Sequence, residues 1–219
     1  MKNYLYMLLC FLFLPLHSAD NEIFLDQSGT GANIDLEQLG ISNIIGGLSS
    51  SAGNLTAFDL DGTGMTLDIN MIGATNKFLG DIWADSFTGI YNFTGSTNTF
   101  TIQVDPSNTY GADSSNQNVA VTGAGNTFTL NQATSALAAT LDLDWIIQGS
   151  DNTVTYTGTG VTASAGGYFY LDHTGGSRSF NIQQLSTQDN DWLKIISVGG
   201  NSSSTVCVIQ NDQGTAVGC

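Results

Sequence analysis

The sequence predicts an all-β protein, a stacked β-arch solenoid in which successive coils of the chain lie on one another. Three observations predict it. A Gly-x-x-Asn motif recurs, each copy lies between short segments of alternating apolar and polar residues, and β-branched and aromatic residues outweigh helix formers. A repeat of this length cannot bury its apolar face alone and must stack on its neighbours. We expect about six to seven irregular coils, with a β-sandwich as the alternative.

The repeated motif predicts a tight corner in each coil. Glycine adopts positive φ without steric cost, and asparagine tolerates it better than most residues. A buried asparagine can also hydrogen-bond to the matching residue of the next coil, which builds a ladder. An ordinary hairpin turn uses the same residue types. A sixth copy has Arg178 in place of asparagine, and a seventh around Gly199 is degenerate. The five predicted corners are Gly40 with Asn43, Gly73 with Asn76, Gly95 with Asn98, Gly123 with Asn126, and Gly149 with Asn152.

The segments that flank each corner predict which side chains are buried. Side chains alternate across a strand, so Phe100 and Ile102 should face one way while Thr99 and Thr101 face the other. Later repeats have the same pattern. Stacking would then place aromatic residues on one another inside the solenoid and threonines on one another outside.

The first residues of the chain predict a signal peptide over 1–19. Lys2 is followed by an apolar run that is too short for a comfortable membrane span. We therefore expect a secreted, extracellular or surface-attached protein with one repeat domain over 20–219. Cys207 and Cys219 remain after cleavage, and a disulfide between them would close a C-terminal cap over about 199–219. Two free thiols or an intermolecular bridge are the alternatives.

The charge of the chain bounds its partners. The formal net charge is −15, and removal of Lys2 with the signal makes it −16. Nucleic acid is excluded because its phosphates would be repelled, and an anionic membrane surface is disfavoured for the same reason. A divalent cation or a basic partner stays open. The simplest interpretation is that the acids keep a β protein soluble.

Residues 59–64 contain the best candidate for a metal site. Asp59 and Asp61 precede Gly62 and resemble the first half of a calcium loop. A complete loop needs a bidentate acid at its twelfth position, where this chain has Asn70. The segment therefore favours a plain Asp-Gly turn, and we expect neither a bound metal nor a cofactor.

Catalysis has weak support in the sequence. Asp142 and Asp144 could form a glycosidase pair on one strand face, but nothing nearby provides a raised pKa or a cleft. His173 is the only histidine after cleavage, and no nucleophile elbow surrounds it. Tyr168, Tyr170 and Trp192 could stack on sugar rings, although large aromatic residues more often complete a core. We expect no enzyme.

Several segments resemble the curlin repeat. That repeat has the pattern Gln-x-Gly-x-x-Asn with a second glutamine six residues past the asparagine. Gln38-Leu-Gly40-Ile-Ser-Asn43, Asn126 to Gln132 and Arg178 to Gln184 match parts of it, and Gln27 lies in a further similar segment. The departures are that most copies lack the first glutamine and that the repeat lengths vary. Curlin repeats form the subunits of curli, a bacterial surface amyloid of adhesion and biofilm matrix.

The resemblance implies a secreted, cross-β, fibre-forming structural protein that acts by self-association and has no catalytic site. Gln27, Gln38, Gln132 and Gln184 would then form glutamine ladders beside the asparagines. The alternative function is an adhesin that holds glycan or protein on a cell surface or a virion appendage. The third hypothesis is a β-helix enzyme that acts on polysaccharides. The partners that we expect are further copies of the chain, surface glycans, or secretion and appendage proteins.

Overall fold

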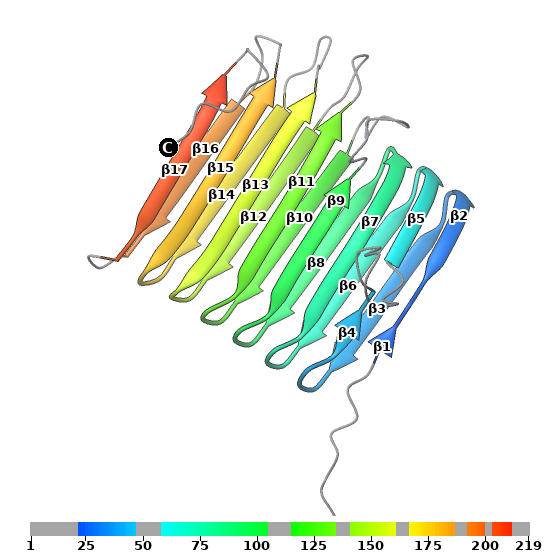
Figure 1. Cartoon of the computed structure of the whole chain (residues 1–219), viewed down its shortest axis with the longest axis horizontal. Helices are drawn as coiled ribbons and strands as arrows, with labels where there is room; N and C mark the ends of the chain where they lie inside the picture. Colours follow the sequence, from blue (N-terminus) through cyan, green and yellow to red (C-terminus); the bar gives the residue numbers. More distant parts are fainter. Residues whose placement is uncertain are drawn as a thin grey trace, which may run out of the picture.

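The chain is organised as two facing stacks of parallel strands (Figure 1). The computed structural model describes residues 22–46, 58–104, 115–134, 141–160, 167–186, 192–199 and 203–211, and within these ranges all regular elements are strands. The predicted signal peptide and Cys219 lie outside them. Among the described residues, no helix is long and apolar enough to cross a bilayer.

The ten-stranded sheet collects the strands that follow the corners, together with the first strands of the chain. Its members are β1 (Glu22–Ile23), β2 (Asp26–Thr30), β4 (Ile44–Ile45), β5 (Phe58–Thr63), β7 (Lys77–Asp85), β9 (Thr99–Val104), β11 (Thr127–Thr134), β13 (Asn152–Gly160), β15 (Arg178–Ser186) and β17 (Thr205–Asn211).

The seven-stranded sheet collects the strands that precede the corners. Its members are β3 (Asn33–Leu39), β6 (Thr66–Ile72), β8 (Thr88–Thr94), β10 (Ser115–Thr122), β12 (Leu141–Gln148), β14 (Gly167–Thr174) and β16 (Trp192–Val198). Every paired strand in both sheets is parallel, and each pairs with the equivalent strand of the adjacent coil. The predicted all-β solenoid is therefore confirmed over the β-sandwich, which needs hairpin-joined antiparallel strands.

The in-register pairing places equivalent residues in columns that run along the stack. One inner column of the ten-stranded sheet contains Phe78, Phe100 and Phe128, and the ring centroids lie 5.3 and 5.7 Å apart. Tyr91 and Trp145 project into the same core from the facing sheet and are fully buried. These contacts give the aromatic interior that the alternating segments predict, because like residues meet when parallel strands share one register.

Small residues make room for the largest side chains in this core. A Cβ atom on Gly89 would lie 2.4 Å from the hydroxyl oxygen of Tyr91, and one on Gly158 would lie 2.2 Å from that of Tyr156. Each glycine lies two residues from its tyrosine on the same inward strand face. The sequence thus places a residue without a side chain beside each long ring, and the ring fills the space that is left, as close packing requires.

The uneven repeat spacing has a simple origin in the structure. On the corner side, four residues join β6 to β7, β8 to β9 and β10 to β11, namely 73–76, 95–98 and 123–126. On the opposite side, residues 86 and 87 join β7 to β8, whereas 105–114 lie between β9 and β10. In these coils the length therefore varies on the side opposite the corners. The longest spacing, from Asn43 to Asn76, has another origin: residues 46–57 separate β4 from β5, and both of these strands pair with β7.

Candidate functional site

The five predicted corners stack in one column on the same side of the solenoid (Figure 1). All five asparagines are at most 1% exposed. The backbone N–H of each one donates to the side-chain Oδ1 of the next, over 2.9–3.0 Å from Asn43 through Asn76, Asn98 and Asn126 to Asn152. The asparagines thus satisfy backbone donors that would otherwise be buried without a partner.

The corner glycines allow the coils to approach closely. Gly95 has φ of +132°, and a Cβ atom there would lie 1.9 Å from the backbone oxygen of Gly73 in the adjacent coil. Gly123 and Gly149 have the same relation to the coil before them. No side chain fits at these positions, so glycine is required by contact as well as by conformation.

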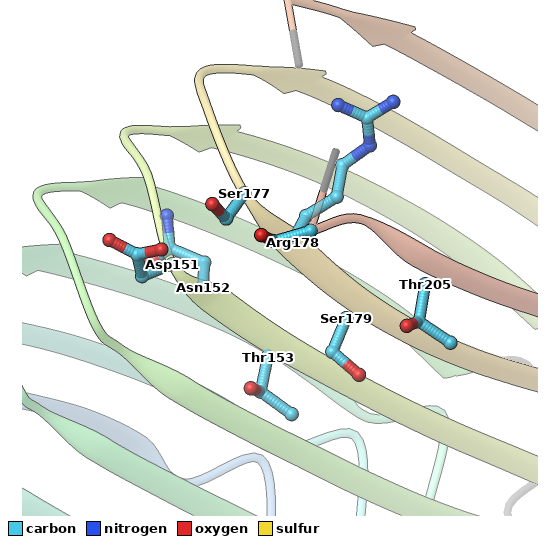
Figure 2. Close-up of a pocket in the computed structure, with 8 residues that line it drawn as sticks. Asp151, Asn152, Thr153, Ser177, Arg178, Ser179 and Thr205 are labelled. Atoms are coloured by element: carbon cyan, nitrogen blue, oxygen red, sulfur yellow. The ribbon is translucent and has the colours of Figure 1, made fainter. Parts of the chain in front are cut away.

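Arg178 ends the asparagine column. It pairs in register with Asn152, but a guanidinium has no acceptor and cannot continue the ladder. Its Nη1 donates instead to the backbone oxygen of Gly199, the degenerate seventh corner. Figure 2 shows its side chain directed away from Thr153 and Ser179. Arg178 also lines an open pocket of about 320 Å³. This pocket is lined by Asp151, Asn152, Thr153, Ser177, Arg178, Ser179, Ser203 and Thr205.

The glutamines do not form the continuous ladder that the resemblance implies. Gln27, Gln132 and Gln184 do share one column of the ten-stranded sheet, but Leu60, Ile82 and Val104 separate the first two, and Gly158 separates the others. Gln38 lies on the facing sheet. The interruption follows from the departures in the repeats, because a column needs the same residue in each coil.

Gln132 has a different partner, which the repeat pattern did not indicate. Its Oε1 accepts a hydrogen bond from Nε2 of Gln117 over 3.0 Å, and both side chains are almost fully buried. Gln117 comes from β10 in the facing sheet, so the two amides join the sheets across the core of one coil. The sequence could not predict this pair, because it does not show which positions of the two sheets face each other.

An aromatic and acidic patch lies on the outer face of the seven-stranded sheet, at its C-terminal end. Tyr168 and Trp192 are 38% and 43% exposed and stack with centroids 4.3 Å apart and planes 5° from parallel. The expectation that they complete a core is wrong, because both occupy outward strand positions. Asp142 is the next residue in their column.

Neighbouring columns add polar groups to this aromatic patch. Tyr170 donates from its hydroxyl to Asp172 Oδ2 over 3.3 Å, and the Lys194 ammonium lies 5.3 Å from the centre of the Tyr170 ring. Burial raises the pKa of Asp144, and the charges of Asp142 and Asp172 raise it further. Asp142 and Asp144 face outward, as predicted, and Asp144 lines a small open pocket of about 110 Å³ together with Asn92, Asn118 and Ile146.

The calcium-loop candidate becomes part of an acidic column. Asp59 lies between Asp26 and Asp81 on adjacent strands of the ten-stranded sheet, with Asp61 two residues along β5. Burial, followed by the charges of Asp61, Asp81 and Asp26, raises the pKa of Asp59 to about 6. Asp59 and Asp61 lie within a strand rather than in a turn. Within the described ranges, no group of three or more acidic, histidine or cysteine side chains could hold a metal ion.

His173 is buried at the C-terminal end of the core. Its Nδ1 lies 3.4 Å from Ser197 Oγ, and its ring packs edge-on against Phe180. Burial lowers the pKa of His173, and the nearby charge of Arg178 lowers it further. Asp172 precedes it in β14 and therefore projects to the opposite face, so these residues do not form a Ser-His-Asp arrangement.

Cys207 is disulfide-bonded. Its predicted partner, Cys219, lies outside the described residues, so the pairing of these two cysteines stays a prediction. Comparison with known proteins finds no matching protein family, no matching curated protein and no matching solved structure.

Proposed function

We propose that this chain is a secreted structural subunit that associates head to tail, end of solenoid on end of solenoid, into a fibre or surface appendage. It would act by self-association and adhesion rather than by catalysis. The curlin-like corners and the predicted signal peptide favour this proposal. The observation that carries it is that the edge strands at both ends of the described solenoid pair on one side only.

At both ends of the stack, the described edge strands pair on one side only and leave the other edge without a partner strand. β3 pairs only with β6, β16 only with β14, and β17 only with β15. The last strand of the ten-stranded sheet leaves two core positions open, since Val206 and Val208 are 49% and 42% exposed. Unpaired parallel edges with apolar side chains are templates for another chain.

The two ends also match each other in register. The inner columns that begin with Ile34 and Leu36 on β3 end with Leu193 and Ile195 on β16. The same register relates Asp35, an exposed acid at the first end, to Lys194 at the last. A second copy stacked in phase would therefore set a lysine beside an aspartate and continue the apolar columns. A head-to-tail contact of this kind does not close on itself and produces a filament.

The test is fibre formation by the mature protein and by charge variants, followed by negative-stain microscopy and thioflavin fluorescence. We expect the wild type to form fibres and Lys194→Glu to delay them, because the variant would place two acids together at the junction. Combining Lys194→Glu with Asp35→Lys should restore the rate.

Lys77→Glu is the matched control because Lys77 lies within the stack rather than at its end. The proposal fails if the wild type remains monomeric at all concentrations in sedimentation, or if Lys77→Glu delays fibres as strongly as Lys194→Glu. Failure of the double variant to restore assembly would contradict the proposed register.

A second candidate function is glycan binding by the aromatic patch. The exposed Tyr168–Trp192 stack favours it, because aromatic faces contact the apolar faces of sugar rings while nearby carboxylates accept from sugar hydroxyls. Trp192→Ala should abolish binding on a glycan array. Trp83→Ala, on the ten-stranded sheet, should leave binding intact. Equal effects of the two variants, or no glycan bound by the wild type, would contradict this function.

A further inference from the structure

The outer face of the ten-stranded sheet carries a regular array of threonines. They form two columns across three adjacent strands, and all are half-buried. The first column continues with the hydroxyl residues Ser179 and Thr205, and Figure 2 shows Thr153, Ser179 and Thr205 in a row on one face. The threonine array comprises Thr99, Thr127 and Thr153 in the first column and Thr101, Thr129 and Thr155 in the second.

The array is a two-dimensional lattice of methyl and hydroxyl groups. Strand pairing separates neighbours within a column by about 4.8 Å, and alternation along a strand separates the two columns by about 6.6 Å. The β-branched side chain is stiff at χ1, so a ladder of one residue type repeats its two terminal groups regularly. Phe100 and Phe128 pack directly beneath it, with centroids 5.7 Å apart, and give it a rigid support.

The array differs in charge from the rest of the molecule. The other outward positions on its three strands whose side chains are described are Gln103, Asn131 and Thr157, so none there is charged. The chain as a whole has a formal charge of −15. Charged groups hold hydration shells of their own, and none lies among the six threonines. The exposed Lys77 borders the array beside Thr99, at the end of the first column.

From this geometry we propose that the threonine array binds the surface of ice. The two repeat distances are close to those of water oxygens on the prism faces of hexagonal ice. A single threonine–water hydrogen bond contributes little, because it replaces an equivalent bond in bulk water. Immobilising a water molecule on a protein surface has an entropic cost, but in ice the waters are already ordered. Six rigid threonines that engage together add their small contributions.

The proposal is independent of fibre formation and is tested on monomeric protein, as verified by sedimentation. The assays are the growth of a single ice crystal below its melting point and the inhibition of ice recrystallisation. We expect the wild type to arrest growth and to keep crystals small. Thr129→Lys should lose most of both activities, since it sets a hydrated charge in the centre of the array.

Thr122→Lys makes the same change at an exposed position on the seven-stranded sheet and should keep both activities. If circular dichroism shows that Thr129→Lys does not fold, Thr129→Ser takes its place. That variant keeps the hydroxyl but loses the methyl group, and it should also lose activity. A wild type that leaves ice growth unchanged, or a Thr122→Lys loss equal to that of the array variant, overturns the proposal.

Discussion

At the scale of single residues, the asparagine column explains why one side chain recurs in a repeat that otherwise tolerates wide variation. Asn126 accepts from the backbone of Asn98, donates its own N–H to Asn152, and donates from Nδ2 to the backbone oxygen of Gly95. Both a donor and an acceptor are needed, and a short side chain must present them at the corner. Arg178 offers only donors, so the asparagine column ends at Asn152, one coil before it.

Asn126→Ala should lower the free energy of unfolding by about 2–3 kcal/mol, because it leaves the buried N–H of Asn98 without an acceptor. Denaturant unfolding followed by circular dichroism measures the change. The matched control is Asn131→Ala on the outer face, which should stay within about 0.5 kcal/mol of wild type. Equal losses would show that the asparagine ladder contributes nothing specific.

Asp59 is expected to make stability depend on pH in a direction opposite to that of a salt-bridged acid. Its pKa is raised from 3.8 to about 6 in the folded chain, so the folded state binds the proton more tightly than the unfolded state between these values. The contribution of Asp59 to stability is therefore fully present below about pH 4 and is lost as the pH rises through about 6.

Asp59→Asn removes this effect and should stabilise the protein at pH 7 by about 1 kcal/mol, a figure reduced for solvent screening because the side chain is only half-buried. The gain should disappear at pH 4. Thermal unfolding at the two pH values measures it, with Glu37→Gln on the exposed face of β3 as the control. A gain that persists at pH 4 would contradict the assigned cause.

At the scale of the element, each corner combines a positive φ with close contact between coils. These two requirements can be separated, because Gly125 also has positive φ, of +68°, but an added Cβ would only touch Thr97 Cγ2 at 3.5 Å. At Gly95 the added atom would overlap a backbone oxygen of the adjacent coil. Glycine at the first corner position is thus set by the neighbouring coil, and glycine at the third by local conformation.

Gly125→Ala should cost about 1 kcal/mol, the usual penalty for a non-glycine residue in the left-handed region. Gly95→Ala should cost more than about 3 kcal/mol, because the coils must separate as well. The two midpoints of urea unfolding give the comparison. Similar values would mean that stacked coils can move apart at a corner without loss elsewhere.

At the scale of the whole molecule, the solenoid is a one-dimensional stack in which each coil contacts only the coils beside it. Stability is then the sum of coil and interface contributions, and damage has consequences that depend on position. A destabilising substitution in a central coil divides the folded stack in two, whereas one in a terminal coil only reduces the number of folded coils. Each interior coil has a neighbouring coil on both sides, whereas a terminal coil has one on a single side. A further copy of the chain could therefore stack only on the two ends.

Phe128→Ala, in the centre of the aromatic column, should cost about 3–5 kcal/mol and increase amide hydrogen exchange in β9 and β13 on both sides. Val206→Ala, in the same column at the open end, should cost below about 1 kcal/mol and affect β15 and β17 alone. Uniform exchange across the chain after either substitution would show that the stack unfolds as one unit.

Much of this arrangement could be predicted from residue patterns. The five Gly-x-x-Asn copies indicated the corners, and alternation placed Phe100 inside and Thr99 outside. What could not be predicted depends on contact between distant segments. The Gln117–Gln132 pair, the Asp26–Asp59–Asp81 column and the outward Tyr168–Trp192 stack each join residues from different strands, and only strand register decides which residues meet.

The local chemistry of the chain determined that it forms coils, because glycine, asparagine and alternating apolar residues restrict each repeat to strand, corner and strand. Tertiary structure alone decided the surfaces and the ends: which acids share a column, how the threonines form a lattice, and that Lys194 and Asp35 occupy the same register at opposite ends. The physical reason is that backbone preferences act over a few residues, whereas columns arise only when parallel strands pair across the whole stack.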